Sequence, residues 1–153
     1  MSNEYVAARA DILKSNLERM GVPNAVVLNE APARIADALP EFFDRVLVDA
    51  PCFRRGAMFR KEPVARQQHC EALVKQCAEL GAEILDCAAA VLAPGGQLVY
   101  STCTFAPEED EGQVAAFLQR HPGVHPLRMP WEMWTTPLAA RAKPTAPAVC
   151  RWM

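Results

Sequence analysis

The sequence predicts an α/β fold with a parallel sheet, and two observations support this. Short apolar segments alternate along the chain with longer segments of helical periodicity. Residues 46–48 and 98–100 are almost continuous apolar runs, which are typical of strands that helices cover on both faces. With 153 residues, 51% of them hydrophobic, the chain is long enough for about one domain with a buried core.

The first part of the chain predicts two helices and two strands. Residues 4–20 carry apolar side chains at helical spacing and are followed by a glycine, which is a stop signal. Residues 25–28 form a short apolar run, which predicts a buried strand. A proline opens a short helix over about residues 32–39. Residues 44–49 predict a second strand that ends in an acid, and residues 51–63 predict a loop rich in proline and glycine.

The second part begins with a long helical pattern over residues 64–92, with Gly81 as a candidate kink. Residues 93–96 (Ala-Pro-Gly-Gly) predict a turn, and residues 97–101 predict a third strand. A further helix is expected over about residues 107–121. Its first turn is rich in acids, which the helix dipole favours.

The composition changes near residue 124, so the chain is expected to divide into a domain over 1–123 and a tail over 124–153. The tail is rich in proline and is predicted to be mostly irregular, with one short strand near residues 124–128. Trp131 and Trp134 are expected to pack against the domain rather than to stack on bases.

Several classes of protein are excluded by composition. A net charge of −2 argues against a wholly basic protein that coats nucleic acids. No apolar run approaches the roughly 20 residues that span a bilayer, and the first residues do not form a secretory signal. We therefore expect a cytoplasmic protein without a membrane partner.

The six cysteines form no CxxC pair, which argues against zinc-ribbon and thioredoxin sites, and we expect no metal. In a reducing compartment we expect free thiols rather than disulfides. Those within the long helical segment are predicted to be small buried apolar residues. The cysteines are Cys52, Cys70, Cys77, Cys87, Cys103 and Cys150.

Two of the predicted strands end in residues with reactive side chains. Residues 49–52 (Asp-Ala-Pro-Cys) follow one strand, and residues 101–105 (Ser-Thr-Cys-Thr-Phe) end the next. Ligands bind at the carboxyl ends of strands in open α/β sheets, so Cys52, Cys103 and Asp49 are expected to surround one crevice. Two thiols and a carboxylate there suggest covalent catalysis by a thiolate. The alternative is that the two cysteines are buried or incidental.

The two motifs and their flanks together carry a resemblance to a known family. Residues 49–52 are followed by Met-Phe-Arg-Lys at 58–61, by Pro63, and then by Pro-Gly-Gly-Gln-Leu-Val-Tyr-Ser-Thr-Cys-Thr-Phe at 94–105. This order resembles the RNA cytosine-C5 methyltransferases of the Nop/Sun type, in particular the bacterial branch of type F that acts on 16S ribosomal RNA of the small subunit. The resemblance covers about residues 3–121.

The resemblance implies a Rossmann-like fold that binds S-adenosylmethionine, of which this chain holds strands 3 to 5 with their flanking helices. The family's sheet has the order 3-2-1-4-5, and the glycine-rich loop that cradles the cofactor lies about one strand before Asn3. The chain is therefore expected to begin after strand 2, with residues 25–28 as strand 3. Either the edges of the separated strands are exposed, or residues 25–28 pair directly with residues 46–48.

The implied activity is transfer of a methyl group from S-adenosylmethionine to C5 of cytosine in RNA, with ribosomal RNA as the expected substrate. Cys103 matches the family's nucleophile, which adds to C6 of the base. Cys52 matches the cysteine that helps to release the methylated product. Asp49 is expected to hydrogen-bond the cytosine edge and stabilise the adduct.

Further residues match family positions near the cofactor. Glu4 lies where the family places the acid that binds the ribose hydroxyls, and its alternative role is that of a solvated acid before a helix. Asn29 and Glu30 follow the next strand, near the expected adenine pocket. Asp49 and Pro51 are expected to line the same cofactor site.

One basic cluster flanks the proposed pocket, and it departs from the family in sequence. The family's small Ser-Gly-acid-Gly segment is Phe-Arg-Arg-Gly at 53–56 here, with Ala57 as an extra residue, so bulky side chains replace a tight loop. RNA phosphates are one expected partner of the cluster, and a solvated loop face is the alternative. The candidate RNA-binding residues are Arg54, Arg55, Arg60 and Lys61; Arg66 lies nearby and Glu62 opposes them.

Residues 109–111 (Glu-Asp-Glu) stand where the family has Glu-Asn-Glu, so one acid replaces an amide. Because part of the cofactor site is missing, we expect a catalytic half of a methyltransferase domain over 1–123 with low or no activity alone. The alternative is a degenerate domain that binds RNA or a partner without turnover. A methyltransferase acting on an exocyclic amine is disfavoured, because that chemistry needs no thiol.

Overall fold

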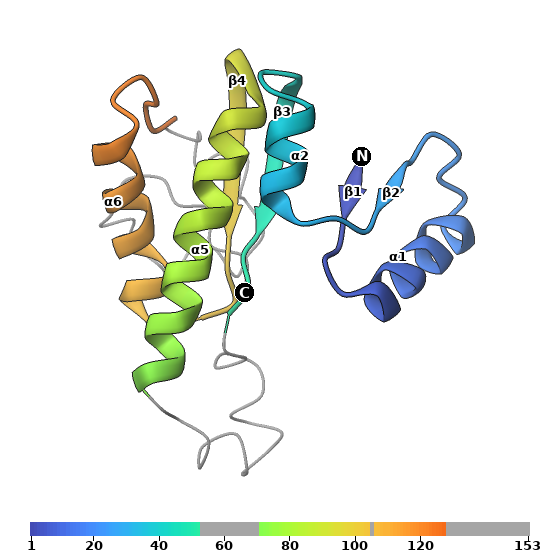
Figure 1. The fold of residues 1–153 in the computed structure, drawn as a ribbon, viewed down its shortest axis with the longest axis horizontal. Helices are drawn as coiled ribbons and strands as arrows, with labels where there is room; N and C mark the ends of the chain where they lie inside the picture. Colours follow the sequence, from blue (N-terminus) through green and yellow to red (C-terminus); the bar gives the residue numbers. More distant parts are fainter. Residues whose placement is uncertain (53–70, 105, 128–153) are drawn as a thin grey trace, which may run out of the picture. The chain divides into compact units, whose positions relative to one another are not determined.

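The structure is a computed structural model, and it describes residues 1–52, 71–104 and 106–127 (Figure 1). The chain divides into two compact units, which are described separately below. Unit 1 comprises Met1–Val46 and Cys87–Gln97, and unit 2 comprises Leu47–Asp86 and Leu98–Met153.

Helices and strands alternate along the described residues, as the sequence predicts for an α/β protein. None of the helices in these residues is long and apolar enough to cross a membrane. The elements in chain order are β1 (Ser2–Asn3), α1 (Ala7–Arg19), β2 (Val27–Leu28), α2 (Pro32–Ala38), β3 (Phe43–Asp49), α5 (Glu71–Val91), β4 (Leu92–Ser101), the 3-10 helix η1 (Pro107–Glu109) and α6 (Glu111–Arg120).

In unit 1, β1 and β2 form a two-stranded parallel pair. Ser2 lies opposite Val27 and Asn3 opposite Leu28, and the Glu4 amide continues the pairing by donating to the Leu28 carbonyl at 3.1 Å. The sequence predicted a strand only at residues 25–28 and considered exposed edges or pairing with residues 46–48. Both alternatives missed β1, because two polar residues carry no apolar periodicity and pair here through their backbone.

The helices of unit 1 follow the predictions closely. α1 begins at Ala7 rather than at residue 4, because the preceding residues extend β1 and turn into the helix. It ends before Gly21, which has a φ of +68° and donates its amide to the Glu18 carbonyl at 3.0 Å. Glycine adopts this left-handed backbone conformation without steric cost, as expected of a helix stop. α2 matches the short helix predicted over residues 32–39.

β3 and β4 form the second sheet, and their hydrogen bonds advance in the same direction along both strands. The Phe42 amide donates to the Val91 carbonyl at 2.9 Å, and the Ala50 amide donates to the Ser101 carbonyl at 2.8 Å. The strands are therefore parallel, as predicted.

The turn predicted at residues 93–96 is wrong, because β4 already begins at Leu92. Two glycines make this possible. Gly95 has a φ of +78°, and a Cβ atom on Gly96 would lie 3.0 Å from the Asp44 carbonyl oxygen of β3. Glycine therefore lets β4 pass close to its neighbour where the sequence signals only a turn.

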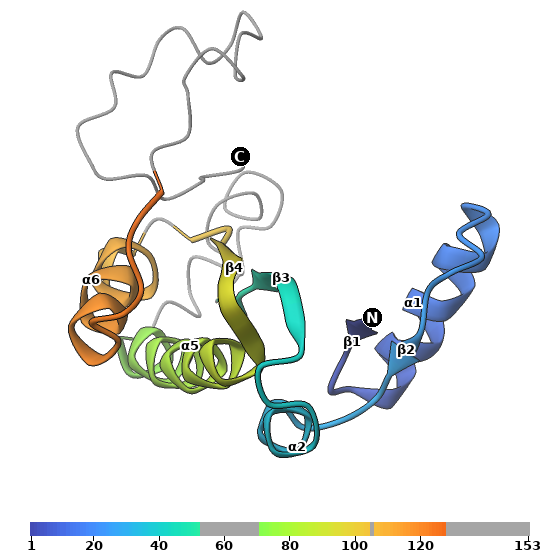
Figure 2. The same ribbon diagram turned by 90° about the horizontal axis from the view of Figure 1, so that it is seen from above.

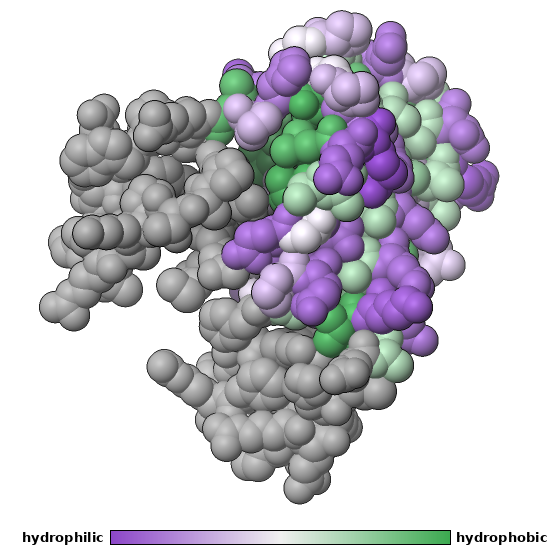
Figure 3. Space-filling view, turned by 90° about the vertical axis from the view of Figure 1, so that its left-hand side faces the viewer, coloured by the Kyte–Doolittle hydropathy of each residue, from purple (hydrophilic) through white to green (hydrophobic). Residues whose placement is uncertain are grey.

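In unit 2, α5 and α6 lie side by side and cover one face of the strand ends (Figures 1 and 2). α5 runs as one continuous helix through Gly81. A Cβ atom at Gly81 would lie 3.5 Å from the Tyr100 hydroxyl, so this glycine lies where helix and strand approach each other. Leu85 of α5 is 1% exposed, and Phe117 of α6 is 4% exposed. Seen from the side of α6, the described surface carries hydrophilic residues interspersed with hydrophobic ones (Figure 3).

Within the part of the chain that the structure describes, helices do not cover both faces of β3 and β4, contrary to the prediction from the sequence. Val48 and Tyr100 are buried, whereas Leu47 is 68% exposed and Val99 is 38% exposed. Neighbouring residues of a strand point to opposite faces of the sheet. Val48 and Tyr100 therefore mark the covered face, and Leu47 and Val99 mark the open one. Within the described residues, α5 and α6 supply helices to the covered face alone.

The helix predicted over residues 107–121 is divided into η1 and α6, with the break at Asp110. The strand predicted near residues 124–128 is not formed at 124–127. The predictions for residues 53–70, and for the tail from residue 128 with its two tryptophans, lie outside the described residues.

Candidate active site

The thiol pair lies at the carboxyl ends of β3 and β4 in unit 2. Cys52 follows β3 by three residues, and Cys103 follows β4 by two. Their Cα atoms are 6.2 Å apart, and their sulfur atoms are joined in a disulfide. The predicted juxtaposition of the two cysteines is therefore confirmed. The expectation of free thiols is wrong for this pair, whose sulfur atoms are bonded at a Cα separation that a disulfide can bridge.

Hydrogen bonds between the strand ends explain why residues so distant in sequence meet here. The Ala50 amide donates to the Ser101 carbonyl at 2.8 Å, and the Ser101 hydroxyl donates to the Val48 carbonyl at 3.2 Å. These bonds fix the register of β3 on β4 at the last residues of both strands. The loops that follow therefore leave the sheet next to each other, which brings Cys52 to Cys103.

Cys103 is exposed although both of its neighbours are buried. Thr102 is 6% exposed and Thr104 is 3% exposed. Their side chains turn inward, so the chain presents Cys103 at the surface of the loop. Asp49 lies at the end of β3 with an exposed side chain, and Pro51 is half-buried. Their expected contacts with the base and the cofactor remain predictions.

A second group of predicted residues gathers in unit 1, at the carboxyl ends of β1 and β2. The Asn29 side-chain amide donates to the Glu4 carbonyl at 2.7 Å and to the Tyr5 carbonyl at 2.8 Å. Asn3 and Glu30 form a reciprocal pair, because the Asn3 amide donates to the Glu30 carbonyl and the Glu30 backbone amide donates to Asn3 Oδ1. The structure thus brings Glu4, Asn29 and Glu30 together, and their role in binding the cofactor stays a prediction. Asn3 also belongs to this group, because its side chain holds the backbone of Glu30, and the sequence did not predict this role.

The Glu4 carboxylate is held by two groups at the start of α1. Oε1 accepts the Val6 amide at 2.9 Å, and Oε2 pairs with Arg9 at 2.9 Å. Only 18% of the Glu4 side chain is exposed, so it is not the solvated acid of the alternative interpretation. A carboxylate has about four lone-pair positions, so Glu4 retains capacity to accept hydroxyl groups of a ligand. The Glu30 carboxylate pairs with Arg34 at 3.0 Å.

A buried polar group behind the Cys103 loop was not identified from sequence. Glu109 is 2% exposed, and its carbonyl accepts the Tyr100 hydroxyl at 2.8 Å. Burial raises the pKa of Tyr100 to about 12, with the negative charges of Asp110 and Glu109 adding to the effect. The sequence marked these acids as first-turn acids of a helix and as the counterpart of the family's Glu-Asn-Glu segment, but it did not predict that they are buried.

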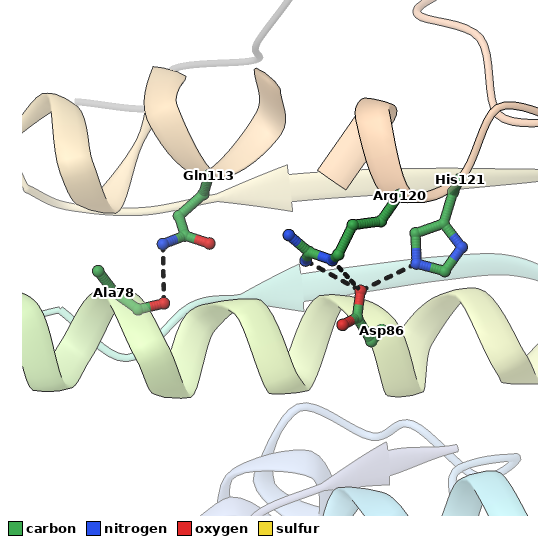
Figure 4. Close-up of polar contacts among 5 residues, drawn as sticks. All are labelled: Ala78, Asp86, Gln113, Arg120 and His121. Atoms are coloured by element: carbon green, nitrogen blue, oxygen red, sulfur yellow. Dashed lines mark hydrogen bonds and ion pairs between the residues drawn. The ribbon is translucent and has the colours of Figure 1, made fainter. Parts of the chain in front are cut away.

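The segment around η1 is attached to α5 by side chains of α6 (Figure 4). Gln113 donates through Nε2 to the Ala78 carbonyl at 2.7 Å and to the Glu108 carbonyl at 3.1 Å. At the other end of α6, Arg120 and His121 both contact Asp86 of α5, at 3.0 and 2.9 Å. These contacts fix α6, and with it η1, on the long helix.

Some predicted residues fall outside the described part of the chain. This applies to the RNA-binding candidates Arg54, Arg55, Arg60 and Lys61, and to Cys70 and Cys150. Cys77 and Cys87 lie on α5 and are half-buried, which is close to the predicted role of small core residues. Over residues 1–52, 71–104 and 106–127, no cluster of three or more His, Cys, Asp or Glu side chains is suited to a metal ion.

Comparison with protein families and curated proteins gives consistent matches. The family model described as "16S rRNA methyltransferase RsmB/F" matches residues 1–143. The ribosomal RNA small subunit methyltransferase F of Cronobacter sakazakii is 39% identical over 122 residues, which are 80% of this chain and 25% of that protein. The protein of the same name from Vibrio parahaemolyticus is 41% identical over 111 residues, 72% of this chain and 23% of that protein. The chain thus spans about a quarter of the length of these relatives.

Solved structures show the same relationship. The crystal structure of PH0851 superposes with a TM-score of 0.75 at 33% identity, covering 84% of this chain and 29% of that one. NSun6 from Pyrococcus horikoshii, crystallised with SFG, superposes with a TM-score of 0.67 at 27% identity, covering 77% of this chain and 29% of that one. These likenesses confirm the predicted Rossmann-like fold and its partial extent. With a family model that matches nearly its whole length, the chain belongs to the RsmB/F family of 16S rRNA methyltransferases.

Proposed function

We propose that this chain forms the catalytic part of an enzyme that transfers a methyl group from S-adenosylmethionine to C5 of cytosine in RNA, with ribosomal RNA of the small subunit as substrate. The observation that carries the proposal is the exposed Cys103 held beside Cys52 at two adjacent strand ends. Membership of the RsmB/F family supports the reaction class. The chain spans about a quarter of the length of its relatives, so the activity of the whole protein is part of this proposal.

The chemistry follows from the weak nucleophilicity of C5 in cytosine. The Cys103 thiolate forms a bond to C6, and the π electrons of the C5–C6 double bond move so that C5 becomes nucleophilic. S-adenosylmethionine, when bound, supplies the methyl group that C5 accepts, with S-adenosylhomocysteine as the leaving group. A base then removes the C5 proton, the double bond re-forms and the bond between sulfur and C6 breaks. We assign to Cys52 a role in this release, and to Asp49 a hydrogen bond to the base.

The disulfide sets a condition on this mechanism. Sulfur in a disulfide carries no thiolate, so Cys103 as it stands in the structure cannot attack C6. A thiol reductant must first donate two electrons and two protons, which yields two Cys thiols and an oxidised reductant. The reduced chain is therefore the form that we expect to react.

We propose that Glu4, Asn29 and Glu30 of unit 1 bind the cofactor, and we propose the same role separately for Asp49 and Pro51 of unit 2. The acceptor capacity left on the Glu4 carboxylate fits the two ribose hydroxyls, which are hydrogen-bond donors. The structural relative NSun6 is in complex with SFG, an analogue of S-adenosylmethionine, which supports this cofactor. We further propose that the basic residues of the 54–61 segment contact RNA phosphates.

The proposal is tested with RNA that contains 5-fluorocytosine. Fluorine at C5 cannot be removed as a proton, so a competent thiolate stays bound to C6 as a stable adduct. We expect the reduced chain with S-adenosylmethionine to form this adduct, and Cys103→Ala to lose it. Cys77→Ala removes a thiol on α5 and is the matched control, which should retain the adduct. A folded, reduced chain that forms no adduct would contradict catalysis and favour a domain that binds RNA without turnover.

A further inference from the structure

The loop that carries Cys103 is shaped by the two buried threonines beside it. The Thr104 amide donates to Thr102 Oγ1 at 3.4 Å, and the Ala106 amide donates to Thr104 Oγ1 at 3.0 Å. The Thr104 hydroxyl thus already serves as an acceptor, and its single proton is directed elsewhere. Thr104 is therefore the point through which another residue can control the loop.

That residue is Glu109. The Thr104 hydroxyl donates to Glu109 Oε1 at 3.3 Å, and both side chains are almost fully buried. The carbonyl of the same Glu109 accepts the Tyr100 hydroxyl at 2.8 Å. Tyr100 lies three residues before Cys103 and Thr104 one residue after it, so Glu109 attaches to the chain on both sides of the thiol.

The support behind Glu109 is itself fixed. Glu109 ends η1, and the Gln113 side chain joins the Glu108 carbonyl of η1 to the Ala78 carbonyl of α5. A buried carboxyl group is costly unless hydrogen bonds compensate for the lost water. A buried acid can hold a reactive loop rigid through its hydrogen bonds, which an apolar residue at the same position could not form.

We propose that Glu109 is a positioning residue, which acts through Thr104 to hold Cys103 in the orientation that attack on the base requires. This inference rests on the function proposed above. Glu109 itself need touch neither the RNA nor the cofactor. Positioning matters because displacement of a reacting atom by about 1 Å lowers a rate on the order of 100-fold.

A first test measures the orientation of Cys103 without any methyl transfer. In glutathione buffers, Cys52 and Cys103 form their disulfide as oxidised glutathione accepts the two electrons and becomes two reduced molecules. The equilibrium constant reports how well the folded chain holds the two sulfurs together. We expect Glu109→Ala to lower this constant about tenfold or more, because the effective molarity of the pair falls when the loop is released.

Two further variants make the test specific. Glu109→Gln keeps an oxygen that accepts the Thr104 hydroxyl. The equilibrium constant of this variant should therefore stay within about threefold of the original, which is the usual uncertainty of such effects. Glu108→Ala changes the exposed neighbour in the same 3-10 helix and should leave the constant unaltered. Circular dichroism confirms that each variant is folded. The proposal would be overturned if folded Glu109→Ala kept the original equilibrium constant. It would also be overturned if Glu109→Gln lowered the constant as far as Glu109→Ala does.

A second test uses the fluorocytosine adduct. Glu109→Ala should slow adduct formation at saturating RNA, on the order of 10- to 100-fold, while half-saturation by RNA stays unchanged. Glu109→Gln should restore most of the rate. If the unmodified chain forms no adduct, the proposed function fails, and the glutathione equilibrium still decides whether Glu109 positions Cys103.

Discussion

Cys52 and Cys103 are joined by a disulfide although 51 positions separate them in the sequence. Their Cα atoms lie 6.2 Å apart because β3 and β4 are parallel neighbours that end at the same edge of the sheet. The fold thus places two thiols at the edge where parallel sheets bind ligands. Their redox state then decides whether a nucleophile is present there.

The first prediction concerns the reactivity of Cys103. N-ethylmaleimide should leave Cys103 unmodified in the oxidised chain and label it after reduction, because alkylation requires a thiolate. Cys52→Ser removes the bridging partner, so its Cys103 should be labelled without reductant. Peptide mass spectrometry reads the site of labelling, and Cys77→Ala provides the control that keeps the bridge. Labelling of Cys103 in the oxidised, unreduced chain would contradict the pairing.

The second prediction concerns stability. The disulfide closes a loop between residues 51 positions apart, so chain entropy makes the oxidised form more stable by about 4 kcal/mol at most. Unfolding in urea should therefore shift to lower concentration when the chain is reduced. Cys52→Ser should show the lower midpoint with or without reductant. Identical midpoints for the oxidised and reduced chain would show that the bridge does not constrain the unfolded state.

The sequence predicted the thiol site well because its signals are local. Two apolar strands each end in a cysteine motif, and parallel pairing alone brings those ends together. The disulfide was not predictable, because proximity of two thiols does not fix their oxidation state. The motif that contains Glu109 was visible in the sequence, but the burial of Glu109 was not, because it depends on how η1 lies against Tyr100 and Thr104.

The fold predictions that the structure did not match also have physical explanations. β1 consists of two polar residues and is held by backbone hydrogen bonds, so the sequence contains no apolar pattern that would predict this strand. Residues 93–96 carry strong turn signals, yet pairing with β3 draws them into β4. The apolar runs in β3 and β4 predicted that helices cover both faces of the sheet. An apolar run shows only that its residues are apolar, however, and does not show which faces are covered. The exposed Leu47 shows that one face has no cover from the described helices.

The third prediction concerns the core of unit 2. Leu85 of α5 is 1% exposed, so Leu85→Ala should leave a cavity and lower the free energy of unfolding by about 2–5 kcal/mol. Leu80 lies on the same helix and is 46% exposed, so Leu80→Ala should cost less than about 1 kcal/mol. Chemical denaturation of both variants in the same redox state makes the comparison. Equal losses would show that Leu85 is not a core residue.

The fourth prediction concerns alkaline pH. The pKa of Tyr100 is raised from 10.0 to about 12 in the folded chain, chiefly by burial. The raised pKa means that its stabilising contribution is complete below pH 10 and is lost as pH rises through about 12. Tyr100→Phe should remove this alkaline loss. It should also cost about 1–3 kcal/mol near neutral pH, because the buried Glu109 carbonyl loses the hydroxyl that it accepts.

Thermal melts from neutral to alkaline pH test this behaviour. Tyr5→Phe is the matched control, because Tyr5 is 71% exposed. It should melt like the unmodified chain at every pH. If Tyr100→Phe retains the same alkaline loss as the unmodified chain, ionisation of another group is responsible.

The fifth prediction concerns acid pH and the contact between α5 and α6. Burial alone raises the pKa of Asp86, but hydrogen bonds from His121 and Arg120, with the charge of Arg120, outweigh it and leave the pKa below 3.8. A lowered carboxyl pKa stabilises the fold above the unfolded value, and this contribution is lost as pH falls through the folded one.

Asp86→Asn should therefore lower stability at pH 7, and its difference from the unmodified chain should shrink in acid. The Asp86 side chain is 45% exposed, so the loss at pH 7 should stay below about 1 kcal/mol. Glu83→Gln removes an exposed carboxylate from the same helix and should show no such pH dependence. Melting temperatures measured from pH 7 to below the ordinary carboxyl pKa of 3.8 provide the test, because the stabilising contribution falls once the unfolded chain binds the proton. A deficit in Asp86→Asn that stays constant across this range would mean that the Asp86 charge does not hold α6 on α5.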